Sequence, residues 1–280
     1  MRQIRLVPAV FLFGAVGLIR LAAQPYLPPP GELDRLVDRV ALYPDSLLSN
    51  VLAAATYSDQ VPDAEGWAHR HEYLRGEPLA RAISEDRLPF DPSVQALLPF
   101  PQVLELMARD MDWTRRLGDA FLANSGAVMD AVQRMRHRAW DYGYLRTSPQ
   151  LVVRNGPFIE IVPASWDSYY VPVYNPGVIF AGPIRPGVGF GAFISFGPGI
   201  VLGSSFRPWG WYDGGARFYW DRRTVIINNR TWERTYVNRN TYVHPYEVHR
   251  YDRPVERREL HDRREGPERG REGDRGRERR

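Results

Sequence analysis

Hydrophobic residues recur at helical spacing through the first half of the chain. Leu33, Leu36 and Val40 form one apolar stripe with charged residues on the opposite face, which is the pattern of an amphipathic helix. The stripe stops at Pro44 because proline disfavours helical backbone at the residue before it. Similar stripes follow, each introduced by a proline or a capping residue. The pattern predicts seven or so short helices packed as a compact all-α domain over residues 31–146.

Polar residues just ahead of several stripes are typical of helix N-caps, whose side chains accept hydrogen bonds from the first free N–H groups. The expected caps are Asp45, Asp91, Asp112 and Ser125. Gly143 is placed to end the last long helix.

The pattern changes at Thr147. Two apolar runs flank Asn155-Gly156, which predicts a β-hairpin with a type I′ turn, although Pro157 directly after the turn weakens the register. Further short strands are expected at residues 169–174, interrupted by Pro172 and therefore at an edge, at 218–220 and at 224–228. Residues 147–249 thus form a small β-rich region, and the predicted fold class is α+β.

The first 23 residues have the form of a secretory signal peptide. Arg2 and Arg5 precede an apolar run that ends in small residues, and the run is short for a membrane span. Arg20 near the expected cleavage point leaves an uncleaved anchor as the alternative. A Pro-rich leader follows at residues 24–30. The protein is therefore expected in the periplasm or cell envelope.

Charge concentrates at the two ends of the chain. The formal net charge is +4, but Arg2, Arg5 and Arg20 contribute three positive charges, and the tail at 250–280 has 12 Arg against 9 acidic residues. The body between them is near −2, so it gives no basic surface for nucleic acid. The tail lacks apolar periodicity, which predicts disorder, and its interleaved acids argue against nucleic-acid binding. The absence of cysteine excludes disulfides and thiolate chemistry.

Several blocks of the chain, in the same order and spacing, resemble a bacterial family known as the domain-of-unknown-function 3300 family. The blocks are residues 36–44, ending in Ala-Leu-Tyr-Pro; Leu47-Leu48 with residues 53–57; 91–94; 100–104; 112–114; 117–121; 128–134; and 170–176. The resemblance spans residues 33–180. It implies an exported envelope protein, often with a low-complexity tail, and it supplies no catalytic residue because no activity defines the family.

Candidate catalytic and metal-binding residues are few. Glu65, His69 and Glu72 would share one helix face, but catalytic zinc helices usually present two histidines, and His69 and His71 point to different faces. The expected alternative is a solvated, charge-paired surface, and we expect no metal or other cofactor.

A paired-carboxylate hydrolase is the alternative enzymatic reading. It would use the acidic residues Asp110, Asp112 and Asp119. Asp112 already has an explanation as a helix cap. His137, among Arg134, Arg136 and Arg138, is expected at a basic, exposed helix end.

Aromatic residues accumulate after residue 165 and form the candidate binding surface, since aromatic side chains near arginine can stack on sugars or anchor partners. They are Trp166, Tyr169, Tyr170, Tyr174, Trp209, Trp211 and Tyr212. The alternative is that a region poor in aliphatic residues packs its rings as core.

Residues 178–206 are rich in glycine and apolar side chains. The spacing Gly187/Gly191 and Gly199/Gly203 matches helix-packing motifs of membranes, but so many glycines disfavour a helix. An apolar hairpin that packs on the core, or that touches a membrane surface or partner, fits better. The sequence as a whole predicts a non-enzymatic envelope binding or scaffold module, with a cell-envelope hydrolase as the alternative.

Overall fold

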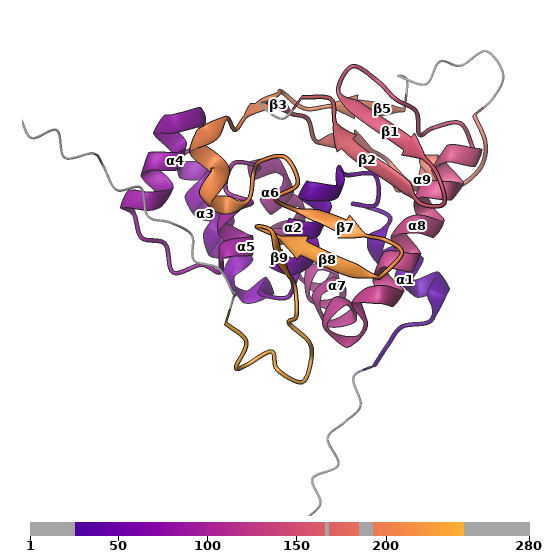
Figure 1. Cartoon of the computed structure of the whole chain (residues 1–280), viewed down its shortest axis with the longest axis horizontal. Helices are drawn as coiled ribbons and strands as arrows, with labels where there is room; N and C mark the ends of the chain where they lie inside the picture. Colours follow the sequence, from indigo (N-terminus) through magenta and orange to yellow (C-terminus); the bar gives the residue numbers. More distant parts are fainter. Residues whose placement is uncertain (1–25, 166–167, 185–192, 244–280) are drawn as a thin grey trace, which may run out of the picture. The chain divides into compact units, whose positions relative to one another are not determined.

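The computed structural model describes residues 26–165, 168–184 and 193–243 (Figure 1). The predicted signal peptide and the predicted tail at 250–280 lie outside these residues. Helices dominate the chain up to Asp141, and small antiparallel sheets follow from Leu151. The predicted α+β class is confirmed.

The helices of the first part follow the sequence pattern closely. They are α1 (Pro30–Val37), α2 (Asp45–Ala55), η1 (Ser58–Gln60), α3 (Val61–Arg70), α4 (Gly76–Glu85), α5 (Pro92–Gln95), α6 (Pro101–Arg109), α7 (Met111–Ala123) and α8 (Ser125–Asp141). Proline in the first turn of α1, α3, α5 and α6 costs no helical hydrogen bond, because the N–H groups there have no partner within the helix. After α8, Gly143 adopts φ +87°, the left-handed conformation expected where this helix ends.

The helix caps differ in part from the prediction. Asp91 caps α5 as expected, because its carboxylate accepts the N–H of Ser93 at 2.9 Å. The caps of α7 and α8 are Asp110 and Asn124, which accept from the third residue along. Asp112 lies inside α7, and Ser125 is the first residue of α8. Those two predictions were wrong because a residue inside the helix cannot adopt the extended backbone of a cap.

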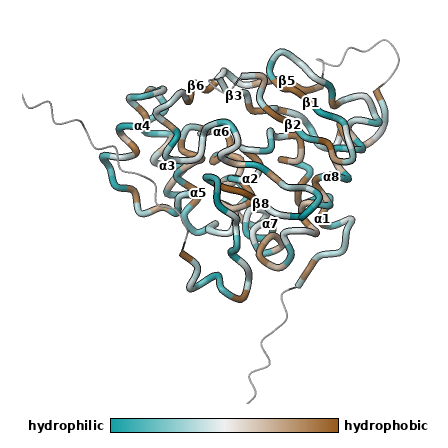
Figure 2. The backbone as a smooth tube through the Cα atoms, viewed as in Figure 1, coloured by the Kyte–Doolittle hydropathy of each residue, from teal (hydrophilic) through white to brown (hydrophobic). Residues whose placement is uncertain are grey.

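Helix α2 occupies the centre of the fold. Every residue from Asp45 to Ala55 is buried, and the helix contacts α5, α7 and the strands β7 (Arg217–Tyr219) and β8 (Thr224–Ile227). A helix that is surrounded on all sides has no solvent face, which explains its largely apolar sequence. Figure 2 shows hydrophobic stretches along α2 and β8, and Val225, Ile226 and Ile227 of β8 are buried.

The predicted hairpin is present, with a different turn. Strands β1 (Leu151–Asn155) and β2 (Ile159–Pro163) are antiparallel, and Asn155 pairs with Ile159. The connection is therefore three residues long, and neither Asn155 nor Gly156 has the positive φ of a type I′ turn. A two-residue turn at Asn155-Gly156 would place Pro157 in the ladder, where it has no N–H to donate.

The expected strand at residues 169–174 divides into β3 (Ser168–Tyr169) and β4 (Pro172–Tyr174). These pair antiparallel with β6 (Ile200–Val201) and β5 (Ile194–Phe196), respectively. The region also contains α9 (Pro176–Ile179) and the 3₁₀-helix η3 (Ser204–Trp209), which the sequence reading did not predict.

The last sheet has the order β7-β8-β9 and covers α2. Its strands are β7 (Arg217–Tyr219), β8 (Thr224–Ile227) and β9 (Arg230–Thr231). The largest hydrophobic core contains side chains of α2 together with Phe218, Val225 and Ile227 of this sheet. Helices and this sheet therefore share one core. Within the described ranges, no helix has both the length and the apolar character required to cross a bilayer.

Candidate functional site

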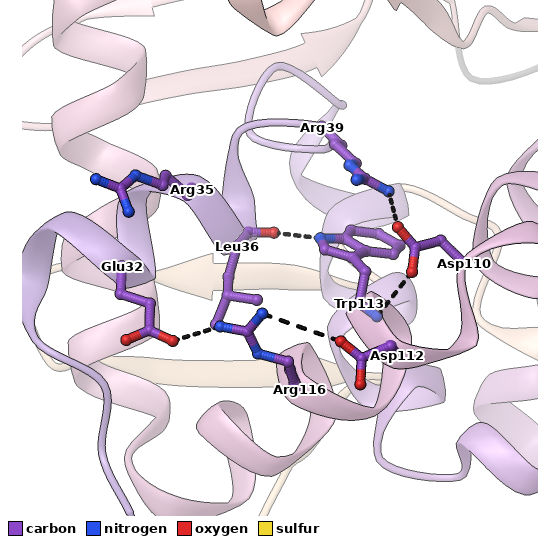
Figure 3. Close-up of a pocket in the computed structure, with 8 residues that line it drawn as sticks. All are labelled: Glu32, Arg35, Leu36, Arg39, Asp110, Asp112, Trp113 and Arg116. Atoms are coloured by element: carbon purple, nitrogen blue, oxygen red, sulfur yellow. Dashed lines mark hydrogen bonds and ion pairs between the residues drawn. The ribbon is translucent and has the colours of Figure 1, made fainter.

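A charged groove lies between α1 and the start of α7 (Figure 3). Its volume is about 280 Å³. The lining residues are Glu32, Arg35, Leu36, Arg39, Asp110, Asp112, Trp113 and Arg116. The two helices lie far apart in the sequence. Arg39, two residues after α1, and Asp110, directly before α7, are separated by 71 residues.

Trp113 forms the apolar part of the groove and ties the two helices together. Its indole N–H donates to the carbonyl oxygen of Leu36 at 2.8 Å. The Arg39 guanidinium lies 5.2 Å from the centre of the indole ring, within the range of a cation–π contact. Trp113 is buried, so its position is fixed by the core.

Asp110 is held in its ionised form. Its carboxylate accepts the backbone N–H of Trp113 and a hydrogen bond from Arg39 at 2.8 Å. The Trp113 N–H and the Arg39 guanidinium hold the pKa of Asp110 below its usual value. A general acid for glycoside hydrolysis needs the opposite shift, so this carboxylate is poorly suited to that role.

The other acidic groups of the groove form ion pairs. Arg116 pairs with Glu32 across the two helices and lies 4.0 Å from Asp112 on its own helix. Arg35 is exposed, and within the described ranges no ion pair involves it. Its guanidinium therefore differs from those of Arg39 and Arg116, which are engaged in ion pairs within the groove.

A second recess of about 290 Å³ adjoins the groove, because Glu32 and Arg116 line both. Its remaining walls come from the leader, α7 and the C-terminal part of the described chain: Tyr26, Pro28, Asp119, Ala120, Tyr236 and Arg239. Arg239 lies over the Tyr236 ring at 4.1 Å. The Glu32–Arg116 ion pair therefore sits where two recesses of mixed charge and aromatic character meet.

The aromatic residues expected to form a binding surface do not form one exposed face. Trp166 lies outside the described residues. Tyr169, Trp209 and Trp211 are buried in the core. Their polar atoms bond within the protein: the Tyr169 hydroxyl lies 2.6 Å from Ser46 Oγ, and the two indole N–H groups donate to Gln95 Oε1 and the Ala96 carbonyl.

The remaining three tyrosines are half-buried. The Tyr174 hydroxyl donates to the Asp38 carbonyl at 2.8 Å, and the Tyr212 hydroxyl lies 3.4 Å from Asn228 Oδ1. The Tyr170 ring packs against Gly199. Tyr174 packs against the hydrophobic core, to which Tyr169, Trp209 and Trp211 belong, as the alternative interpretation of these rings expects.

A buried polar centre was misread from the sequence. Asp45 is not a cap, and Arg136 is not at an exposed helix end, since the Arg136 side chain is wholly buried. Arg136 contacts Asp45 at 2.6 Å and also donates to the carbonyls of Ala41, Tyr43 and Ile159. The one feature of the sequence that could have predicted the burial of Arg136 is its position three residues before Ala139, a buried residue on the inner face of α8.

The same centre covers the free edge of β2. Gln133 exchanges two hydrogen bonds with the backbone of Ile159, and the Asp45 carboxylate accepts the N–H of Ile161 at 3.4 Å. The indole N–H of Trp220 donates to the other Asp45 oxygen. Because side chains occupy this strand edge, it is not available for pairing with another chain.

The histidine-containing helix α3 presents an ion pair and a ring stack. His69 lies 3.4 Å from Glu72, while His71 stacks on Trp67. Across the residues that the structure describes, no group of three or more His, Cys, Asp or Glu side chains is arranged to hold a metal ion.

The fold and the groove define a mixed α+β protein with a charged groove between two of its helices. Residues 30–253 match the family model described as "Protein of unknown function (DUF3300)", so the chain belongs to this family. It is 36% identical to the Uncharacterized protein YacH of Escherichia coli (strain K12), over 53% of this chain and 29% of YacH. The chain thus spans less than a third of the length of that curated relative. No solved structure matches it.

Proposed function

We propose that the protein is an exported, cell-envelope binding or scaffold module that holds an envelope protein or polymer in the groove between α1 and α7. The observation that carries the proposal is the groove itself: guanidinium and carboxylate groups line a recess whose apolar wall, Trp113, is fixed by the core. Groups positioned before a ligand arrives lose little freedom on binding, which favours recognition.

Binding fits the groove better than acid–base catalysis. A catalytic acid or base needs a pKa near the working pH, whereas the pKa of Asp110 is lowered by its hydrogen bonds. Arg35 and Arg39 offer donors to a carboxylate or phosphate of the partner, in the forked geometry that arginine provides. Export rests on the signal-like residues 1–23.

A second contact is proposed through the apolar residues of 178–206. Val178 and Val201 expose 38% and 54% of their surface, respectively. Apolar side chains displayed in this way can touch a membrane surface or a partner. This contact would strengthen retention at the envelope without requiring a membrane-spanning helix.

Fractionation of a C-terminally tagged full chain, with salt and detergent washes of the envelope pellet, tests the proposal. Retention that salt removes indicates the charged groove or the arginine-rich tail, because salt screens exposed charges. Retention that only detergent removes indicates residues 178–206. Release of the unmodified protein into the soluble periplasm contradicts the anchored role.

A matched pair of variants separates the groove from general charge. Arg35→Glu reverses a charge in the groove, whereas Arg115→Glu makes the same change at an exposed position of α7 that does not line it. We expect Arg35→Glu to be released at lower salt and Arg115→Glu to behave like the unmodified protein. If both variants are released at the same salt concentration, the groove is not the site that retains the protein.

A further inference from the structure

Three aromatic rings stack at the end of α3. The Trp67 and His71 rings are 4.0 Å apart with an angle of 19° between their planes. The His71 and Tyr73 rings follow at 6.3 Å and 23°. The series runs from a buried indole to a tyrosine that exposes 74% of its surface.

The inner two rings are fixed by hydrogen bonds. The Trp67 indole N–H donates to Asp86 at 2.7 Å. His71 Nδ1 lies 2.9 Å from the Trp67 carbonyl oxygen. Since a carbonyl oxygen can only accept, this nitrogen carries the proton, and Nε2 is left as the other polar atom of the ring.

The turn that carries Tyr73 is also held in place. The N–H of Leu74 donates to the His71 carbonyl at 2.9 Å. The Arg75 guanidinium donates to the carbonyls of Leu74 and Glu72. Tyr73 is therefore presented on a hydrogen-bonded turn, although it has little contact with the core.

We propose that the exposed Tyr73 ring, backed by His71, forms a stacking platform for a neutral saccharide ring. The C–H bonds on one face of a pyranose carry partial positive charge, and the face of an aromatic ring attracts them. A rigid ring with few rotatable bonds gives contact area at low entropic cost. Glu72, the exposed residue between His71 and Tyr73 in the chain, carries a carboxylate that can accept hydrogen bonds from sugar hydroxyls.

The surrounding charges favour a saccharide over a single-stranded nucleic acid. Stacking on bases is usually combined with a positively charged track for the phosphates. Here an acidic residue, Glu72, stands between His71 and Tyr73 in the chain, and Arg75 is engaged with backbone carbonyls. No residue of the platform lines the groove between α1 and α7, so the two sites can be tested independently.

The test is titration of the purified full chain with chitotetraose, a neutral chain of four N-acetylglucosamine units, by calorimetry and saturation-transfer NMR. We expect Tyr73→Ala to weaken binding about tenfold or more and Tyr73→Phe to stay within about twofold, because phenylalanine keeps the ring face. Tyr219→Ala, at an exposed tyrosine of β7 that lines neither recess, is the control and should bind like the unmodified protein.

Three results would overturn the proposal. The first is that Tyr73→Ala binds chitotetraose as well as the unmodified protein, and the second is that the unmodified protein shows no saturation transfer at all. The third is that an oligothymidine binds through Tyr73 more tightly than the saccharide does, which would make the platform a base-stacking site. Tyr73 is exposed, so its substitution leaves the core intact, and circular dichroism checks this for each variant.

Discussion

The guanidinium of Arg136 on α8 meets the carboxylate of Asp45 on α2 at 2.6 Å, with the arginine side chain fully removed from solvent. Burial raises the pKa of Asp45, and the Arg136 guanidinium acts in the opposite direction. The Arg136 guanidinium also lies 5.0 Å from the Trp220 ring centre. One buried pair thus connects α2, α8, β2 and the end of β7.

Arg136→Met should lower the free energy of unfolding by about 3–5 kcal/mol at pH 7, because it removes the counter-charge of the buried Asp45 carboxylate and the hydrogen bonds from Arg136 to the Ala41 and Tyr43 carbonyls. Urea unfolding followed by circular dichroism measures the loss. Arg134→Met is the control, since Arg134 is exposed and its pair with Asp34 lies at the surface. A loss below about 1 kcal/mol for Arg136→Met would show that the pair is not a structural centre.

Asp38 should make stability depend on pH in the mildly acidic range. Burial raises its pKa from 3.8 to about 6, despite the opposing charge of Arg39. The folded protein holds the Asp38 proton more tightly than the unfolded chain does. Protonation of Asp38 therefore adds fully to the free energy of unfolding below pH 3.8, and this stabilisation is lost as pH rises through about 6.

Asp38→Asn should therefore stabilise the protein at pH 7.5 by about 1–2 kcal/mol, a value reduced for the partial exposure of the side chain. Paired urea titrations at pH 7.5 and near pH 3.5 measure the difference between variant and unmodified protein. The two should converge at the lower pH. A constant difference at both values would contradict the raised pKa.

Gly118→Ala should destabilise the protein by about 1–3 kcal/mol or more. A Cβ at residue 118 of α7 would lie within 2.1 Å of the Ala55 carbonyl oxygen on α2, so the two backbones could not keep their distance. Gly31→Ala is the matched control in α1, where a Cβ meets no atom within 4 Å. In thermal unfolding, the midpoint temperature should fall clearly for Gly118→Ala and should stay the same or rise slightly for Gly31→Ala.

Arg234 should hold the last described segment against the helices. Its guanidinium donates to the Thr56 carbonyl at 2.6 Å and lies 3.6 Å from the Tyr57 ring centre. Removal by Arg234→Ala should speed hydrogen exchange of the Tyr236 N–H, which donates to the Leu122 carbonyl, by about tenfold or more. Arg230→Ala, at an exposed position of β9, should leave that exchange rate unchanged.

The helical half of the fold was predictable because its signals are local. Proline at a helix start, an apolar stripe and a closing glycine act within a few residues, and α1 to α8 appear where these signals lie. The hairpin at Asn155 was found for the same reason. Its turn type was missed because Pro157 restricts which residues can pair.

Burial of polar and aromatic residues could not be predicted in this way. Asp45 resembles a cap in its local sequence, yet its partners Arg136 and Trp220 lie 91 and 175 residues away. Tyr169 and Trp211 look like surface anchors in a glycine-rich segment, yet they pack against Phe100 of the helical part. The groove likewise needs α1 and α7 side by side.

The sequence by itself determined the class of fold, the positions of the helices and the family to which the chain belongs, because each depends on neighbouring residues or on their order. Only the tertiary structure decided which charges are buried, which rings are core and which side chains line a groove. All three properties depend on packing between segments that are far apart in the chain. The free-energy cost of removing a charge or a ring from water depends on the partners that folding brings next to it, and the local sequence does not contain those partners.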